Sequence, residues 1–175
     1  MSISLYDITV ITYLQELEAV SGFMEKARQH FESEGRDSQL LVEARICDDM
    51  LPMSFQVNSV THHSAGAMDA LASGVFTPPP SLPETDYSGL QDMVTAARTR
   101  LQSLDRDTVN SYLGKDLIFA VGDRKMPFVA EDFILSFSLP NFFFHATTAY
   151  DLLRSAGAPI GKRDYLGTLR MKQSL

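Results

Sequence analysis

Four polar residues recur at spacings of three and four within an otherwise apolar stretch of the sequence: Ser138, Asn141, His145 and Thr148. This spacing places side chains on one face of an α-helix. Five phenylalanines lie between positions 133 and 144 around them. A buried polar group needs a partner, because leaving it unpaired costs about 1–3 kcal/mol. The stripe is therefore either a set of mutually satisfied core groups or a binding site.

His145 is the member of this stripe best suited to chemistry, because imidazole can act as an acid or a base near neutral pH. Asn141 lies one turn before it, so both side chains could contact one ligand. An earlier amphipathic stretch places Gln56 on its inward face, with Asp49 near its start. We predict His145 as the catalytic candidate. The predicted pocket residues are Gln56, Asn141, Asp49, Thr148 and Tyr150.

Metal binding is the second chemistry that these residue types allow. His145 could be joined in principle by His30, near the rim of one apolar face, or by His63, near another. Zinc and nickel prefer imidazole, thiolate or carboxylate, whereas Asn and Gln are poor ligands. The ligand set for a divalent metal is thus incomplete, and we expect no cofactor.

The cysteine content narrows the chemistry further. The single Cys47 excludes a disulfide framework and a multi-cysteine zinc site. It is followed closely by Asp48 and Asp49, and nearby negative charge raises the pKa of a thiol. We therefore do not expect a reactive thiolate.

Length and composition indicate one domain spanning residues 1–175. Hydrophobic residues make up 45% of the chain, the net charge is −7 and the pI is about 5.0. This balance argues against a nucleic-acid partner. We read neither a signal peptide nor a run of the roughly 20 apolar residues that a membrane span needs. The expectation is a cytoplasmic protein with no membrane partner, ending in a basic tail over about 158–175.

Hydrophobic periodicity predicts the helices that must position these residues. The first covers residues 3–20, breaks or kinks at Ser21-Gly22, and continues to a C-cap at Gly35. A segment capped by Asp37 or Ser38 follows and runs past Cys47. The next helix begins near Asp49 and ends at Gly74. A further helix spans 87–104.

The last predicted helix runs from about 131 to about 156 and ends at Gly157. It is apolar almost all round, which is typical of a central, buried helix. Pro140 should kink or restart it.

Two other segments interrupt the helical pattern. Residues 75–86 hold four of the eight prolines and predict a semi-rigid surface crossover. Alternation over about 115–129, around Gly122-Asp123, predicts a β-hairpin in which Pro127 lies at an edge or an end. The predicted fold is all-α, a four-helix bundle with a small β-hairpin insert before the last helix.

Several segments together resemble a family of uncharacterised proteins, a domain of unknown function grouped with the DinB/YfiT-like helix bundles. They are QVNSV (Gln56 to Val60), LPNFFFHATTAYDLLR (Leu139 to Arg154) and GKRDYLG (Gly161 to Gly167), with YDITV near the start and DDMLPMSFQ before QVNSV. The resemblance covers nearly the whole chain. It implies a DinB-like up-down-down-up four-helix bundle, often a homodimer.

The wider group includes proteins regarded as metalloenzymes and thiol-dependent transferases, with three histidines on a divalent metal. The resemblance implies that Gln56 stands near the second-helix ligand position, with Asn141 and His145 at the two positions of the last-helix pair. Only one of the three histidines is therefore kept. Gln56, Asn141 and His145 would be the converted remnant of a metal site.

Two hypotheses about function follow. The first is a non-catalytic, small-ligand-binding or stress-associated homodimer with a degenerate metal-site pocket. The alternative is an enzyme of the metal- or thiol-dependent transferase or hydrolase type that uses His145.

Overall fold

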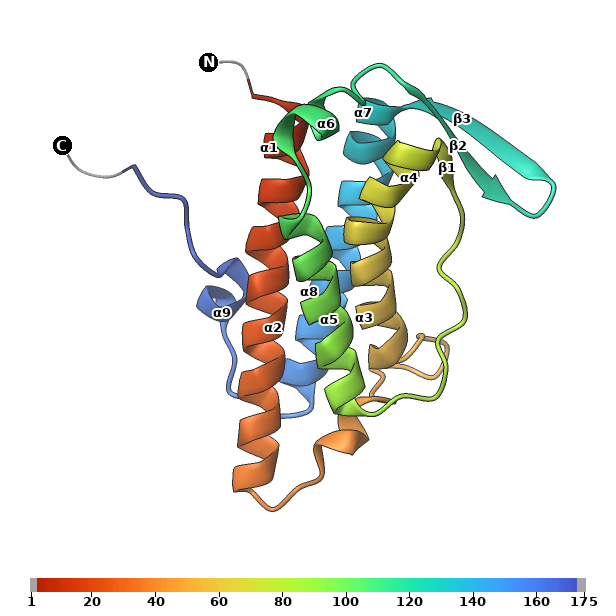
Figure 1. Ribbon diagram of the computed structural model, residues 1–175. Coiled ribbons are helices and arrows are strands. Elements are labelled where there is room, and N and C mark those ends of the chain that lie inside the picture. Colours follow the sequence, from red (N-terminus) through yellow and green to blue (C-terminus); the bar gives the residue numbers. More distant parts are fainter. Residues whose placement is uncertain (1–2, 173–175) are drawn as a thin grey trace.

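Long helical segments pack as a bundle in the computed structural model, which describes residues 3–172 (Figure 1). Helices α2 (Val10–Ser33) and α8 (Leu139–Ser155) run in one direction. Helices α3 (Met53–Thr61), α4 (Ala67–Ser73) and α5 (Tyr87–Gln102) run in the other. The predicted up-down-down-up bundle is confirmed.

The first bundle helix continues without interruption past Ser21-Gly22, where the sequence predicted a break or kink. A four-residue helix, α1 (Leu5–Ile8), is closed by a capping box between Ser4 and Asp7, and α2 then continues for 24 residues through Gly22. The helix therefore does not break at Ser21-Gly22, and the interruption lies earlier, at Thr9 between α1 and α2. An interior glycine costs only about 1 kcal/mol, and the fully buried Phe23 and Met24 beside it favour an unbroken helix. The turn at Gly35, with φ +68°, ends the segment as predicted.

The second bundle helix begins later than predicted, at Met53, with Pro52 as its N-cap. Asp37 caps only a short 3₁₀ turn, η1 (Ser38–Leu41), and residues 42–52 form a loop. Asp49 and Cys47 therefore lie in this loop and not in a helix. Gln56 lies on a buried face as predicted, and the residues that share this face along the second helix are Met53, Val57, Val60, Ser64, Ala67, Met68 and Leu71.

Each of the two helices that carry the predicted site contains a π-helical turn. Between α3 and α4 this is η2 (His62–Gly66), and before α8 it is η3 (Ile134–Ser138), which follows α7 (Ala130–Phe133). Pro140 lies in the first turn of α8, directly after η3, so the α-helical pattern restarts beside this proline as predicted. The last helix is not buried all round as predicted, since Phe144 is 64% exposed and Leu135 is 54% exposed.

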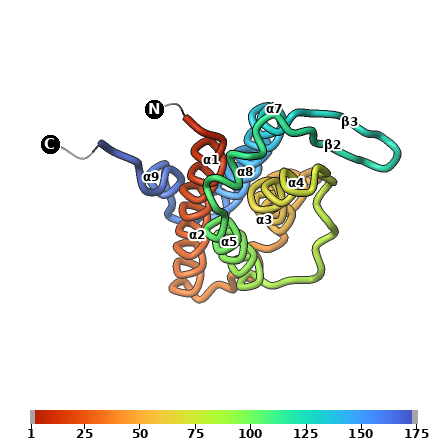
Figure 2. Tube along the Cα trace, turned by 45° about the horizontal axis from the view of Figure 1, so that its top comes forward, coloured from red at the N-terminus to blue at the C-terminus, as the bar shows by residue number. Residues whose placement is uncertain are grey.

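The hairpin is confirmed as β2 (Asp116–Val121) and β3 (Arg124–Val129), paired antiparallel. Pro127 lies on the edge strand opposite Ile118, where a missing donor is tolerated. Two short elements were not predicted: β1 (Val75–Phe76), which pairs in parallel with β2, and α6 (Arg106–Asn110) before the hairpin. The crossover then returns from β1 to the start of α5, and the hairpin projects from one end of the bundle (Figure 2).

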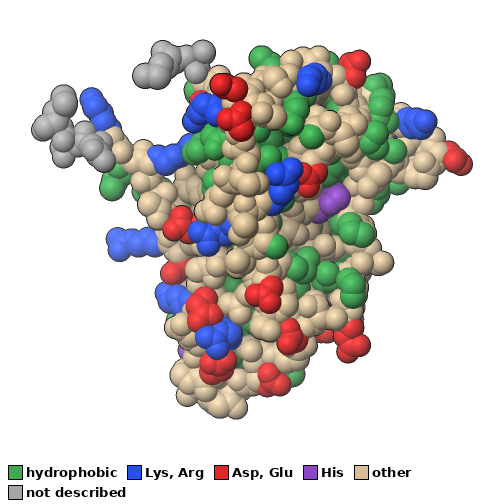
Figure 3. Space-filling model, in the orientation of Figure 1, with side chains coloured by type: hydrophobic (Ala, Val, Ile, Leu, Met, Phe, Trp, Pro, Cys, Tyr) green, Lys and Arg blue, Asp and Glu red, His purple; other side chains and the backbone are tan. Residues whose placement is uncertain are grey.

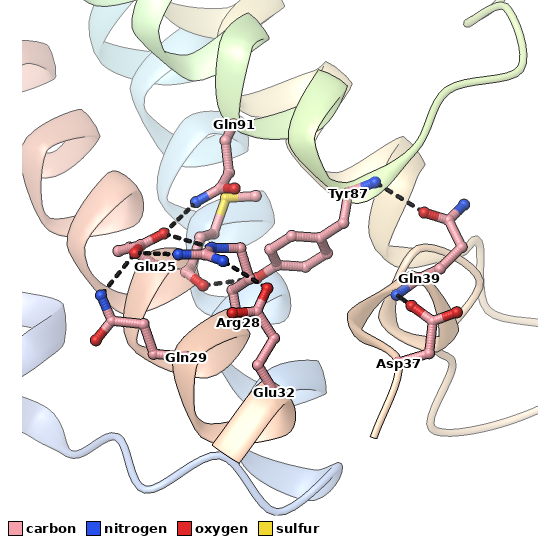
Figure 4. Close-up of polar contacts among 9 residues, drawn as sticks. Glu25, Arg28, Gln29, Glu32, Asp37, Gln39, Tyr87 and Gln91 are labelled. Carbon is pink, nitrogen blue, oxygen red and sulfur yellow. Dashed lines mark hydrogen bonds and ion pairs between the residues drawn. The ribbon is translucent and has the colours of Figure 1, made fainter. Parts of the chain in front are cut away.

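A polar network ties the opposite end of the bundle together (Figure 4). Glu25 of α2 accepts from Arg28 at 2.7 Å and from Gln91 of α5 at 3.0 Å. Arg28 is the main reason that the pKa of Glu25 falls to about 2. The backbone N–H of Tyr87 donates to the Gln39 side chain at 3.0 Å, which joins η1 to α5. On the face that Figure 3 shows, acidic and basic side chains are interspersed.

The C-terminal segment is more than a basic tail, because it contains α9 (Lys162–Leu166) packed against α2. Asp164 pairs with Lys26 of α2 at 3.1 Å. Elsewhere on α2, Glu16 lies near Tyr165 of α9 and is 6% exposed, and its Oε1 has no hydrogen-bond partner among the described residues. Burial raises the pKa of Glu16 to about 7, and the Tyr165 hydroxyl offsets this only partly.

A buried chain of hydrogen bonds crosses the centre of the bundle and joins three of its segments. The Ser138 hydroxyl of η3 donates to the carbonyl of His63 in η2 at 2.7 Å. Since that proton is used, the Tyr13 hydroxyl of α2 donates to Ser138 Oγ, at 3.0 Å. Tyr13 and Ser138 are fully buried. We call these three residues the central clasp.

Ser138→Ala is expected to destabilise the protein by about 1–3 kcal/mol, because it leaves the buried Tyr13 hydroxyl and the His63 carbonyl without partners. Ser136→Ala is the matched control, since this exposed serine lies in the same π-helical turn and bonds only to the Asp132 carbonyl. Its change should stay within about 0.5 kcal/mol. Urea denaturation measures both. Equal losses would contradict a special role for the clasp.

Glu16→Gln is expected to stabilise the protein at pH 8 by about 2 kcal/mol and to have less effect at pH 5. The folded-state pKa is raised above 4.5, so stability is fully present below pH 4.5 and is lost as pH rises through about 7. The amide removes the charge that must otherwise be buried. Denaturation curves at the two pH values measure the difference, and a gain at pH 5 equal to that at pH 8 would contradict the assignment.

Candidate functional site

A pocket of about 330 Å³ lies between the loop before α3, the start of α3, and α8. We call it the α3–α8 pocket. Four of the predicted residues, from three different segments, line it together: Asp49, Gln56, His145 and Thr148. The rest of its wall is mostly apolar and consists of Cys47, Met50, Leu51, Phe55 and Phe144.

A hydrogen bond of 2.8 Å between Gln56 Oε1 and His145 Nδ1 joins the two helices at the pocket. Gln56 Nε2 donates to the Leu51 carbonyl, also at 2.8 Å, and a carbonyl can only accept. The amide orientation is thereby determined, and its oxygen faces the imidazole. His145 Nδ1 must therefore carry the proton in this bond.

The consequence is a defined tautomer for His145. Burial lowers the pKa of His145 to about 4, so the ring is neutral at pH 7. With the single proton on Nδ1, Nε2 has a free lone pair, and it makes no hydrogen bond to any residue between 3 and 172. The arrangement therefore presents a hydrogen-bond acceptor of known direction and no positive charge.

His63, in the π-helical turn η2, packs against the His145 ring. The two imidazoles are nearly parallel, with centroids 6.0 Å apart and an interplanar angle of 16°. Burial, with smaller contributions from His62 and His145, lowers the pKa of His63 to about 3. Its Nδ1 is buried without a partner in the part of the chain that the structure describes. His63 is therefore a neutral member of the aromatic core and contacts Phe76 and Phe137.

On an ordinary α-helix, adjacent side chains such as those of His62 and His63 face in different directions. The π-helical turn instead leaves both rings near Phe76, at centroid distances of 4.5 and 5.3 Å. His62 Nε2 also bonds to the Thr77 carbonyl at 2.7 Å, and burial lowers the pKa of His62.

The proposed metal set of His30, His63 and His145 is not assembled. His30 lies in the last turn of α2, where it pairs with Glu34 at 3.4 Å. Between residues 3 and 172, no three His, Cys, Asp or Glu side chains come together as a metal site. Gln56, Asn141 and His145 do not fit a three-histidine metal centre either, because Gln56 already bonds to His145 and Leu51.

Two predicted pocket residues point elsewhere. Asn141 donates to the Phe137 carbonyl one turn back, at 2.7 Å, and does not line the pocket. The cause is local competition by the backbone, which is common for a short amide on a helix. Tyr150 packs edge-to-face against Phe23 and Tyr165, and it lines a separate cavity of about 160 Å³ between α8 and α9. Neither residue joins His145 as predicted.

Sequence reasoning missed the part of the pocket that comes from the loop. Met50 and Leu51 could be placed only by knowing how residues 42–52 fold back, and no periodicity encodes that path. Phe144 was read as a core residue, yet it is 64% exposed and forms one wall. Cys47 is exposed, and a hydrogen bond to Asp49 raises its thiol pKa, as the two aspartates suggested.

Comparison with solved structures places the fold in a known class. The chain superposes on a DinB family member protein from Shewanella denitrificans with a TM-score of 0.79 and 22% sequence identity, covering 97% of this chain and 96% of that one. The arrangement is thus a DinB-like helical bundle.

The sequence itself matches the family described as Domain of unknown function (DUF1993) over residues 5–166. The protein belongs to this family. No curated protein matches the chain. Among the described residues, no helix is both long and apolar enough to cross a membrane.

His63→Phe is expected to make stability less sensitive to acid. The folded-state pKa of His63 is depressed, so stability is fully present above the unfolded value near 6.5 and is lost as pH falls toward about 3. Between pH 7 and pH 5 this residue should account for about 1–2 kcal/mol of the loss. Denaturation at both pH values measures it. An unchanged pH slope in the variant would show that His63 is not the group responsible.

Proposed function

We propose that this protein is a non-catalytic binder of a small molecule, which it holds in the α3–α8 pocket. The observation that carries the proposal is the 2.8 Å bond between Gln56 and His145, which orients a neutral imidazole in a partly apolar pocket. Small-molecule sites commonly combine an apolar wall with a few placed polar groups. Phe55 and Phe144 flank the imidazole edge-on, with ring centroids 5.8 and 5.2 Å from it.

We infer that the pocket is the converted remnant of a metal site. A glutamine that accepts from His145 Nδ1 takes the place that a metal-binding side chain would occupy. The bond satisfies two groups that would otherwise be left unpaired, since Gln56 is only 3% exposed. This supports ligand binding without a divalent metal.

Catalysis by His145 in a transferase or hydrolase reaction is the alternative. The free Nε2 lone pair supports it, because that atom could accept a proton from a substrate. A pKa of about 4 makes it a weak base at pH 7, however, and the raised pKa of Cys47 disfavours a thiolate nucleophile in the same pocket. Binding is therefore the function that we favour.

We also propose a homodimer in the cytoplasm, with a stress-associated role. The support for the dimer is the apolar surface that α8 and its π-helical turn present, with Phe143 36% exposed and Leu135 54% exposed. An exposed free thiol at Cys47 suits a reducing compartment.

A fragment screen by methyl NMR tests the binding proposal, with Met50 and Leu51 as reporters in the pocket wall. Fragments that shift these methyls in the wild type should bind His145→Ala and Phe144→Ala about tenfold more weakly, as expected when about 1.4 kcal/mol of contact is lost. His30→Ala is the control, because His30 is a partly exposed histidine outside the pocket.

Two results would contradict the proposal. One is the absence of any fragment that shifts the two methyl signals. The other is a loss of stability in His145→Ala with fragment affinity unchanged, which would make His145 a structural core residue. Phe144→Ala guards against the possibility that removing His145 simply unfolds the pocket, because the Phe144 ring is largely outside the core.

A further inference from the structure

The side-chain donors around the α3–α8 pocket are mostly used within the protein. His145 donates its only N–H to Gln56, and Gln56 donates one amide hydrogen to the Leu51 carbonyl. What His145 leaves available is the Nε2 lone pair, an acceptor. A ligand that meets this ring in the pocket must supply the hydrogen.

The remaining polar side chains of the wall follow the same pattern. The Thr148 hydroxyl donates to the Phe144 carbonyl at 2.7 Å and so keeps only lone pairs free. The Cys47 thiol lies beside Asp49, which raises its pKa and favours the neutral thiol. Asp49 itself is an exposed carboxyl on the pocket wall and can only accept when ionised.

No cationic side chain lines this pocket among the described residues. Arg45 is the one basic residue of the loop over residues 42–52. It is bound to Glu43 at 3.2 Å, and it also donates to the Met50 carbonyl at 3.3 Å. The pocket is thus lined by acceptors, with a negative charge that is not balanced from within its wall.

Two of the apolar residues of the wall are aromatic. Phe55 and Phe144 lie on either helix beside His145, and an aromatic face attracts a cation in addition to apolar groups. A ligand whose apolar group lies between these rings could place a terminal hydrogen-bond donor near two acceptors, His145 Nε2 and Thr148 Oγ1.

Resting on the proposed function of the pocket, we propose that its ligand class is a small primary amine carried on an apolar or aromatic group. The ammonium hydrogens donate to His145 Nε2 and Thr148 Oγ1, and the charge faces Asp49. The apolar group contacts Phe55 and Phe144. Carboxylate ligands are disfavoured because they would face lone pairs and a like charge.

Three probes of matched shape test this class: benzylammonium, benzyl alcohol and benzoate, each titrated at pH 7 with the Met50 and Leu51 methyls as reporters. We expect benzylammonium to bind about threefold more tightly than benzyl alcohol and about tenfold more tightly than benzoate, the size of one partly exposed charge interaction gained or reversed. Raising the salt concentration should weaken only the benzylammonium affinity relative to the alcohol.

A pair of neighbouring variants isolates the charge. Asp49→Asn should weaken benzylammonium about threefold and leave benzyl alcohol unchanged, while Asp48→Asn, an adjacent exposed carboxyl outside the wall, should change neither. Both changes are on an exposed loop, so folding should be retained.

The possible failures are distinguishable. Equal affinities for the three probes, or tightest binding of benzoate, would overturn the amine assignment and leave the pocket as a binding site. Equal effects of Asp48→Asn and Asp49→Asn would overturn the direct role of Asp49 in that assignment. Failure of all three probes to shift the methyl signals, together with an empty fragment screen, would overturn the proposed function itself.

Discussion

The rest of the structure depends on the hydrogen-bonded clasp from Tyr13 through Ser138 to the carbonyl of His63. A hydroxyl buried at this depth has no water to bond to, so the three segments must keep the register in which these atoms meet. That register sets the two π-helical turns against each other. It also brings the ring of His63, a member of the clasp, against that of His145, and about two helical turns from the clasp it makes Gln56 face His145.

Desolvation determines the protonation state of His63 and His145. Both pKa values fall because the aromatic and aliphatic surroundings disfavour the charged ring. Neutral rings can pack on Phe76, Phe137 and each other without a counter-ion. Desolvation raises the pKa of Glu16, near α9, and so favours its protonated, uncharged form. The bundle therefore buries its ionisable groups mainly in their uncharged forms.

The residue pattern predicted most of the bundle's architecture. The inward face from Met53 to Leu71, the crossover, the hairpin around Gly122-Asp123 and the stop at Gly74 were all predicted correctly, because each rests on periodicity or local turn chemistry. The break at Gly22 was wrong because packing outweighed a weak local preference. The β1 strand and α9 were missed because only contacts with distant segments give such short elements their stability.

The sequence by itself determined which residue types could form a site: one histidine, the amides Gln56 and Asn141, and an apolar surround. Only the tertiary structure decided which of these residues act together. It brought Asp49 and the loop over residues 42–52 to the mouth of the pocket, turned Asn141 to its own backbone and placed Tyr150 on the far side of α8. The reason is physical: spacing along one helix specifies a face, whereas hydrogen-bond direction, tautomer and burial depend on neighbours that are distant in the chain.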